Sequence, residues 1–198
     1  LKSFAEAHPD IPWIVGKGWG YSVFPKLIAD KKYIDAIISD RPVFLAARDG
    51  HMALANSAAI RIAGVDARTA DPPNGRIMKG KDGEPTGEFK EAALRLVRSK
   101  IPEDSDDVRY RTLIAHLDEA ARVGLTAGHD AMSYPSTVEL FQRALSANQL
   151  KLRMRFGMVM IPGVGAYSPK HHLERPITEA DVRPYVHLRD NLKGPVLK

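Results

Sequence analysis

The sequence contains no cysteine, which excludes disulfide bonds and thiolate zinc sites. It also lacks any apolar run near the roughly 20 residues that a membrane-spanning helix needs, and no secretory signal pattern is visible. We therefore expect no membrane partner. The absence of cysteine suits a reducing compartment, so a cytoplasmic location is the expectation.

Long blocks of like charge are absent too. Lysine and arginine number 29 against 24 aspartates and glutamates, a formal net charge of +5. The basic residues are scattered, as at Lys31-Lys32 and Arg153-Arg155, and acidic residues interleave with them. A nucleic-acid-binding surface needs its positive charge concentrated. We therefore expect no nucleic-acid partner.

What is present indicates a folded α/β protein. The 198 residues are 44% hydrophobic and 27% charged, enough for a sizeable core in one or two domains. The chain begins at Leu1 and ends on "GPVLK". We expect both ends to continue in a longer protein.

Residues 1–103 have an irregular α/β pattern. Short strands are predicted in "PWIVGKGWG" and "PVFLAA", and helices over 24–40 and in "NSAAIRIAGV". Asn56 is suited to cap that second helix and Gly64 to end it. "RIMKGKDGEPTGEF" predicts a β-hairpin turning at Lys81-Asp82-Gly83, with a helix following from Phe89 to Ser99.

Residues 104–198 are more regular. A helix opened by Ser105 and closed by Gly124 leads into the strand "LTAGHDA". A helix from Pro135, the strand "LKLRMRFGMVM" and a helix in "TEADVRPYVHLRDNL" follow, with a Gly/Pro/His loop over 162–178. This alternation is typical of βα units with a parallel sheet.

"FLAARDGHMALAN" gathers chemically capable groups at a predicted strand end. Asp49-Gly50 is ordinary turn chemistry, which favours a purely structural role. Alternatively, Asp49 orients His51 through the ring N–H, as carboxylates do for catalytic histidines. The sequence leaves both interpretations open.

His129 and Asp130 are placed similarly, where we expect the carboxyl end of a strand. Ligand sites of βα folds lie at such ends, but a buried structural His-Asp pair fits equally well. Trp19 lies in the Gly-rich "GKGWG", which matches neither the dinucleotide nor the P-loop pattern. Nucleotide binding is therefore rejected.

The spacing of the remaining histidines and the position of Lys90 do not indicate a metal centre. No HxH or HExxH pair occurs; His116 is expected on a helix surface, and His171 and His172 in a solvated loop. Lys90 and Glu91 are expected at a solvated helix start.

Four stretches in order carry a resemblance: "PWIVGKGWG", "RPVFLAARDGHMALANSAAIRIAGV", "PNGRIMKGKDGEPTGEFKEAA" and "GLTAGHDA". Their order and spacing resemble amidohydrolase family 3, the YtcJ-like metal-dependent hydrolases, from about residue 10 to 160. The resemblance implies a (β/α)₈ TIM barrel in which one or two divalent metal ions, with zinc expected, activate water against a carbon–nitrogen bond.

On that resemblance, residues 1–103 are an insertion between barrel strands 1 and 2, and residues 104–198 contain about strands 2 and 3. The metal ligands of the family would then lie before Leu1 and after Lys198. The resemblance implies a carboxylated lysine among these ligands, bridging the metal ions, and neither Lys90 nor Lys198 is taken as that lysine. We expect no metal bound by this chain alone, and its catalytic residues are unknown.

The resemblance makes Trp19, Asp49, His51, His129 and Asp130 candidates for binding a small-molecule substrate. A partial barrel also exposes sheet edges, so a homo-oligomer is possible. The alternative is an autonomous, non-catalytic α/β binding module.

Overall fold

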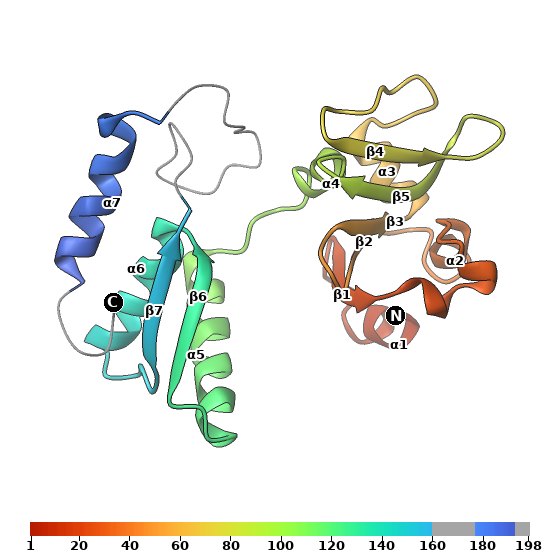
Figure 1. The fold of residues 1–198 in the computed structure, drawn as a ribbon. Coiled ribbons are helices and arrows are strands. Elements are labelled where there is room, and N and C mark those ends of the chain that lie inside the picture. Colours follow the sequence, from red (N-terminus) through yellow and green to blue (C-terminus); the bar gives the residue numbers. More distant parts are fainter. Residues whose placement is uncertain (160–176, 193–198) are drawn as a thin grey trace. The chain divides into compact units, whose positions relative to one another are not determined.

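The computed structural model describes residues 1–159 and 177–192. The chain divides into two compact units, Leu1–Pro102 and Glu103–Lys198, which we describe separately. Both mix helices and strands (Figure 1), which confirms the α/β class. That the first unit is an insertion into a barrel stays a prediction.

The first unit is built on a five-stranded sheet with strand order β1-β2-β3-β5-β4. Strand β1 runs parallel to β2, and the other neighbours are antiparallel. The strands are β1 (Ile14–Trp19), β2 (Val43–Ala47), β3 (Met52–Ala55), β4 (Gly75–Lys79) and β5 (Pro85–Glu91). The predicted hairpin is thus confirmed as β4 and β5, with Gly83 at a positive φ of 81° in its turn.

Each face of this sheet has its own core, because side chains alternate along a strand. Phe89 and Ile77 lie on one face with α3 (Ser57–Ala63) and α4 (Leu94–Arg98). Ile14 and Leu54 lie on the other, packed with residues from α1 (Lys2–Ala7) and α2 (Lys32–Asp35).

The predicted helix over 24–40 is wrong. The structure has two short 3-10 turns, η1 (Tyr21–Val23) and η2 (Pro25–Leu27), before the single turn of α2. Phe24 is extended, with φ −108° and ψ 142°, as expected for a residue that precedes a proline. Lys26 and Leu27 then adopt left-handed φ values of 56° and 57°, which no helix continues through.

The predicted helix start at Phe89 is also wrong. Phe89 pairs with Ala53 and Ile77, so β5 continues through Lys90 to Glu91. Helix α4 begins only at Leu94. The alternation in "GEFKE" has the period of a strand, and it outweighs the helical preference of the residues that follow.

The second unit contains one parallel strand pair. Strand β6 pairs in parallel with β7, with Ala127 opposite Arg153 and His129 opposite Arg155. Its core includes Phe141 and Leu117 from the helices that flank β6 (Figure 1). The elements are α5 (Asp106–Arg122), β6 (Ala127–Ser133), α6 (Pro135–Ser146), β7 (Arg153–Met158) and α7 (Glu179–Asn191).

Helix α5 begins as predicted, because Ser105 Oγ accepts a hydrogen bond from the Val108 N–H. His116 lies exposed on this helix, as expected, with Nδ1 2.7 Å from the Thr112 carbonyl. His171 and His172 lie outside the described residues. Across the described ranges, no helix is long and apolar enough to cross a membrane.

Candidate functional site

Asp49 belongs to the tight turn that joins β2 to β3. The Gly50 N–H donates to the Ala47 carbonyl at 3.1 Å, and Gly50 has a φ of 77°, which favours glycine. Asp49 Oδ1 accepts the backbone N–H of His51 at 3.0 Å. Asp49 therefore shapes the turn through the main chain of His51.

The ring of His51 has a different carboxylate partner. Its Nδ1 lies 3.1 Å from Oε2 of Glu91, at the end of β5. The idea that Asp49 orients this ring is wrong, because the carboxylate of Asp49 is occupied by the backbone. The hydrogen bond and the charge of Glu91 raise the pKa of His51, and its side chain is 66% exposed.

Glu91 holds a backbone conformation that few side chains adopt, with a φ of 51°. Its N–H donates to the His51 carbonyl at 2.8 Å, and the next N–H, from Ala92, donates to the Asn74 carbonyl. The left-handed residue therefore ends β5 while the main chain stays tied to the β2–β3 turn. Sequence reasoning missed Glu91 because it placed this residue on a helix.

Trp19 lies beside the same turn, since the Arg48 N–H donates to the Trp19 carbonyl at 2.9 Å. Its indole N–H donates to the Leu45 carbonyl at 2.7 Å. The ring makes edge-on contacts with Tyr21 and Phe24, at centroid distances of 5.7 and 5.3 Å. Trp19, Asp49 and His51 are thus gathered at one end of the sheet, with the indole N–H used inside the fold.

A second polar cluster lies close to this end of the sheet. The Tyr21 hydroxyl donates to the carboxylate of Glu88, whose residue is only 6% exposed, and lies 3.0 Å from Met52 Sδ. Lys90 Nζ lies 3.3 Å from Oε1 of the same carboxylate. Burial, and then Glu88, raise the pKa of Tyr21, so the phenol is neutral near pH 7. The period-two pattern of "GEFKE" is the signal that would have placed Glu88 and Lys90 on one face.

Asn56 is structural. Its Oδ1 accepts the N–H groups of Val43 and Ala59, and its Nδ2 donates to the carbonyls of Ile38 and Arg41. The residue is fully buried, so all four polar contacts replace water. The predicted helix cap is confirmed, and Asn56 also ties α3 to β2 and to the segment after α2.

His129 and Asp130 belong to the second unit, within β6 rather than at its carboxyl end. His129 is exposed and lies opposite Arg155, so the buried His-Asp pair is wrong. Asp130 is half-buried, and its Oδ1 accepts the N–H of Met132 at 3.1 Å. The two side chains therefore point to opposite faces of the strand.

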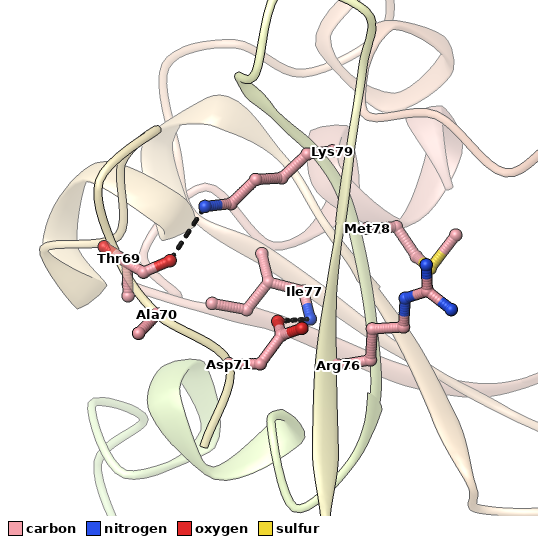
Figure 2. A pocket seen from close by; sticks show the side chains of 7 residues that line it. All are labelled: Thr69, Ala70, Asp71, Arg76, Ile77, Met78 and Lys79. Atoms are coloured by element: carbon pink, nitrogen blue, oxygen red, sulfur yellow. Dashed lines mark hydrogen bonds between the residues drawn. The ribbon is translucent and has the colours of Figure 1, made fainter.

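A pocket of about 300 Å³ lies along β4 (Figure 2). Lys79 Nζ donates to the carbonyls of Ala67 and Thr69, and Asp71 Oδ1 accepts the N–H of Ile77 at 2.7 Å. These contacts hold the preceding loop over the outer edge of β4, which protects an otherwise open sheet edge. None of the predicted site residues lines this pocket.

Metal-ligand groups do not converge in the described parts of the chain, where no three His, Asp or Glu side chains are placed to hold an ion. The residues described thus do not fit a divalent metal centre by themselves.

Comparison with known proteins gives the family. The model of the amidohydrolase family matches residues 1–190. The chain belongs to the amidohydrolase family. This confirms the resemblance seen in the sequence.

Three relatives match much of the chain. It is 41% identical over 128 residues to Protein LONG AFTER FAR-RED 3 of Arabidopsis thaliana, covering 64% of this chain and 22% of that protein. It is 34% identical over 139 residues to YtcJ of Bacillus subtilis (strain 168), which its name assigns to the amidohydrolases, covering 69% and 26%. It is 32% identical over 126 residues to N-substituted formamide deformylase of Arthrobacter pascens, covering 62% and 23%. The chain thus spans about a quarter of the length of these relatives.

Proposed function

We propose that this chain is an internal portion of a metal-dependent hydrolase that cleaves an amide-type, non-peptide carbon–nitrogen bond with metal-activated water. The observation that carries the proposal is the family match over residues 1–190. The name of the Arthrobacter pascens relative, a deformylase of N-substituted formamides, supports this bond class, because a formamide holds its formyl carbon to nitrogen.

In this proposal the metal is held by other parts of the longer protein. The described residues offer no group of three ligands. The resemblance assigns the ligands to stretches before Leu1 and after Lys198, and zinc is the expected ion. A bound ion would supply activated water, and we derive no step through it for the residues of this chain.

The second unit is proposed as part of a TIM barrel. Its β6-α6-β7 order, with β6 and β7 parallel, is the repeating unit of such a barrel. Strands β6 and β7 would be about the second and third strands, and residues 1–103 the insertion between the first and second. A homo-oligomer is also part of the proposal, since a two-stranded sheet leaves edges that another chain can pair with.

The role proposed for this chain is to line the pocket of a small-molecule substrate. In the first unit Trp19, Asp49 and His51 lie at one end of the sheet, and the His51 ring is exposed and ion-paired. In the second unit His129 is exposed on β6 beside Asp130. A histidine held by a carboxylate keeps a defined ring orientation, which suits contact with a polar substrate.

The test uses the full-length protein with its native flanking sequence, assayed for metal content and against a panel of N-substituted amides. We expect bound divalent metal and amide turnover. His51→Ala should lower turnover about tenfold or more with metal content unchanged. His116→Ala is the matched control, since this exposed histidine contacts only its own helix backbone within the described residues, and it should leave turnover unchanged.

Two results would contradict the proposal. Loss of metal in His51→Ala would make this residue part of the metal centre rather than of the substrate pocket. A full-length protein without metal or amide hydrolysis would instead favour the non-catalytic binding module.

A further inference from the structure

Three side chains form a row across three neighbouring strands of the first unit. Lys90 on β5 is paired in register with Met52 on β3 and with Arg76 on β4. Neighbouring positions on these strands, Phe89 and Ile77, are buried in the core of the opposite face. The row Met52–Lys90–Arg76 therefore lies on the other face of the sheet.

The ammonium group of Lys90 is held in place by Glu88 and Tyr21. Its Nζ lies 3.3 Å from the buried carboxylate of Glu88 and 5.7 Å from the centre of the Tyr21 ring. The hydrogen bond with Tyr21, followed by Glu88, raises the pKa of Lys90, so the amine is protonated at neutral pH. Its side chain is still 36% exposed, so the ammonium reaches solvent.

Arg76 is positively charged and has no compensating partner among the residues that the structure describes. It is exposed, and its guanidinium makes no ion pair or hydrogen bond with any residue that the structure describes. Figure 2 shows its side chain leaving β4 on the side opposite Ile77 and Lys79. The guanidinium thus keeps its paired N–H donors available on the face that carries Lys90.

The charges of this row leave an excess of one positive charge. Lys90 and Arg76 carry two positive charges, Glu88 carries one negative charge, and Tyr21 is neutral. Glu91, the next carboxylate along β5, is already paired with His51. Like charges directly opposite each other on neighbouring strands are destabilising, so a bound monoanion would offset the repulsion.

The surroundings of the row favour an anion with an apolar body. Tyr21 and Met52 are half-buried and contact each other through the hydroxyl and the thioether. Trp19 fixes the Tyr21 ring by an edge-on contact, and its own indole is anchored on the Leu45 carbonyl. The partly exposed ring of Tyr21 is therefore a rigid apolar surface beside Lys90, with Arg76 opposite Lys90 on the next strand.

We propose that Arg76 and Lys90 form a binding site for a small-molecule carboxylate whose planar apolar body lies against Tyr21 and Met52. A guanidinium presents two parallel N–H groups that match the two oxygens of a carboxylate, and the ammonium adds a point charge. The site goes beyond the proposed hydrolysis and is tested by binding alone, so either one can fail without the other.

The test is a titration of the ¹⁵N-labelled 198-residue chain with benzoate, followed by its amide chemical shifts. Benzoate should shift the amides of Met52, Arg76 and Lys90. Benzamide has the same shape without the charge, and acetate has the charge without the ring. Each should bind about tenfold more weakly than benzoate, because benzamide lacks the charge that pairs with the two cations and acetate lacks the ring that packs on Tyr21 and Met52.

Variants locate the site. Arg76→Gln should weaken benzoate binding about tenfold, and Arg76→Lys, which keeps the charge but loses the fork, about threefold. The matched control is Arg61→Gln, which removes the same charge from α3 on the opposite face and should leave binding unchanged. The amide spectrum of each variant reports whether the fold is retained.

The proposal is overturned if benzoate and benzamide bind equally, or if Arg76→Gln and Arg61→Gln weaken binding to the same extent. Shifts confined to residues outside the row would overturn it as well. If Arg76→Gln unfolds the chain, Arg76→Lys alone decides, and unchanged benzoate affinity in that variant counts against the site.

Discussion

His51 and Glu91 form an ion pair that joins the β2–β3 turn to the end of β5, with 3.1 Å between Nδ1 and Oε2. A main-chain hydrogen bond from Glu91 to the His51 carbonyl reinforces the same connection. The pair brings together two residues that lie 40 positions apart in the sequence. It makes this end of the sheet sensitive to pH in the range where histidine titrates.

Removing the carboxylate should lower the pKa of His51. In the wild-type chain Glu91 raises this pKa above its usual 6.5, chiefly through the hydrogen bond. Glu91→Gln should return it toward 6.5, measured by NMR titration of the ring protons. An unchanged His51 titration in Glu91→Gln would show that the pair does not persist in solution.

The same pair fixes the sign of a stability effect. The pKa of His51 is higher in the folded chain than in the unfolded chain, where it is about 6.5. The ion pair therefore stabilises the fold fully when the pH is below 6.5. This stabilisation is lost as the pH rises through the pKa of the folded chain. Urea unfolding of wild type and Glu91→Gln should therefore differ more at pH 5.5 than at pH 8.5. The difference should be small, since both side chains are exposed.

Asn56→Ala should destabilise the first unit by about 3 kcal/mol, because it leaves two buried N–H groups, one buried carbonyl and one part-buried carbonyl without the Asn56 side chain as partner. Both tryptophans, Trp13 and Trp19, lie in this unit, so urea unfolding followed by tryptophan fluorescence reports it directly. Ser57→Ala removes a single hydrogen bond, to Asp35, and should cost about 1 kcal/mol. Equal effects of the two changes would contradict the role assigned to Asn56.

The local signals in the sequence predicted much of this fold. The helix cap at Asn56, the glycine at Gly64 and the turn at Gly83 were found because each depends on a few adjacent residues. The period-two alternation of "GEFKE" was overlooked in favour of helix propensity, so Lys90 was misplaced.

Contacts between strands that are far apart in the sequence could not be predicted from the sequence. The partner of the His51 ring is Glu91, which comes close only because β3 pairs with β5, and α3 and β4 lie between these two strands in the sequence. Asp49 is much nearer to His51 in sequence and was therefore the expected partner. Tyr21 lay between the predicted Gly-rich turn and the helix predicted over 24–40, and its bond to Glu88 spans 67 positions. The candidate residues Trp19, Asp49 and His51 lie near one another, and their role in substrate binding stays a prediction. The carboxylates and the lysine around them were not predicted.

Gly87→Ala should be far more costly than Gly83→Ala, although both glycines have positive φ, of 96° and 81°. A Cβ at Gly87 would lie 2.4 Å from the Ala55 carbonyl oxygen and 2.7 Å from Lys31 Cβ. A Cβ at Gly83 would meet no atom within 4 Å. We expect about 1 kcal/mol for Gly83→Ala and about 3 kcal/mol for Gly87→Ala, from backbone strain plus overpacking. Similar unfolding midpoints for the two variants would contradict the close approach of β5 to Lys31 and Ala55.

Tyr21→Phe should destabilise the first unit by about 2 kcal/mol, because the buried Glu88 carboxylate loses its hydroxyl donor and keeps only Lys90. Tyr33→Phe is the matched control. Its ring packs on Phe24, and its hydroxyl makes no hydrogen bond within the described residues, so the loss should stay under about 0.5 kcal/mol. Tryptophan-monitored urea unfolding at neutral pH measures both.

Equal losses of stability in Tyr21→Phe and Tyr33→Phe would contradict the hydrogen bond from the Tyr21 hydroxyl to the Glu88 carboxylate. The Met52–Lys90–Arg76 row would then lose one of its supports, because Glu88 holds Lys90 and is itself held by Tyr21.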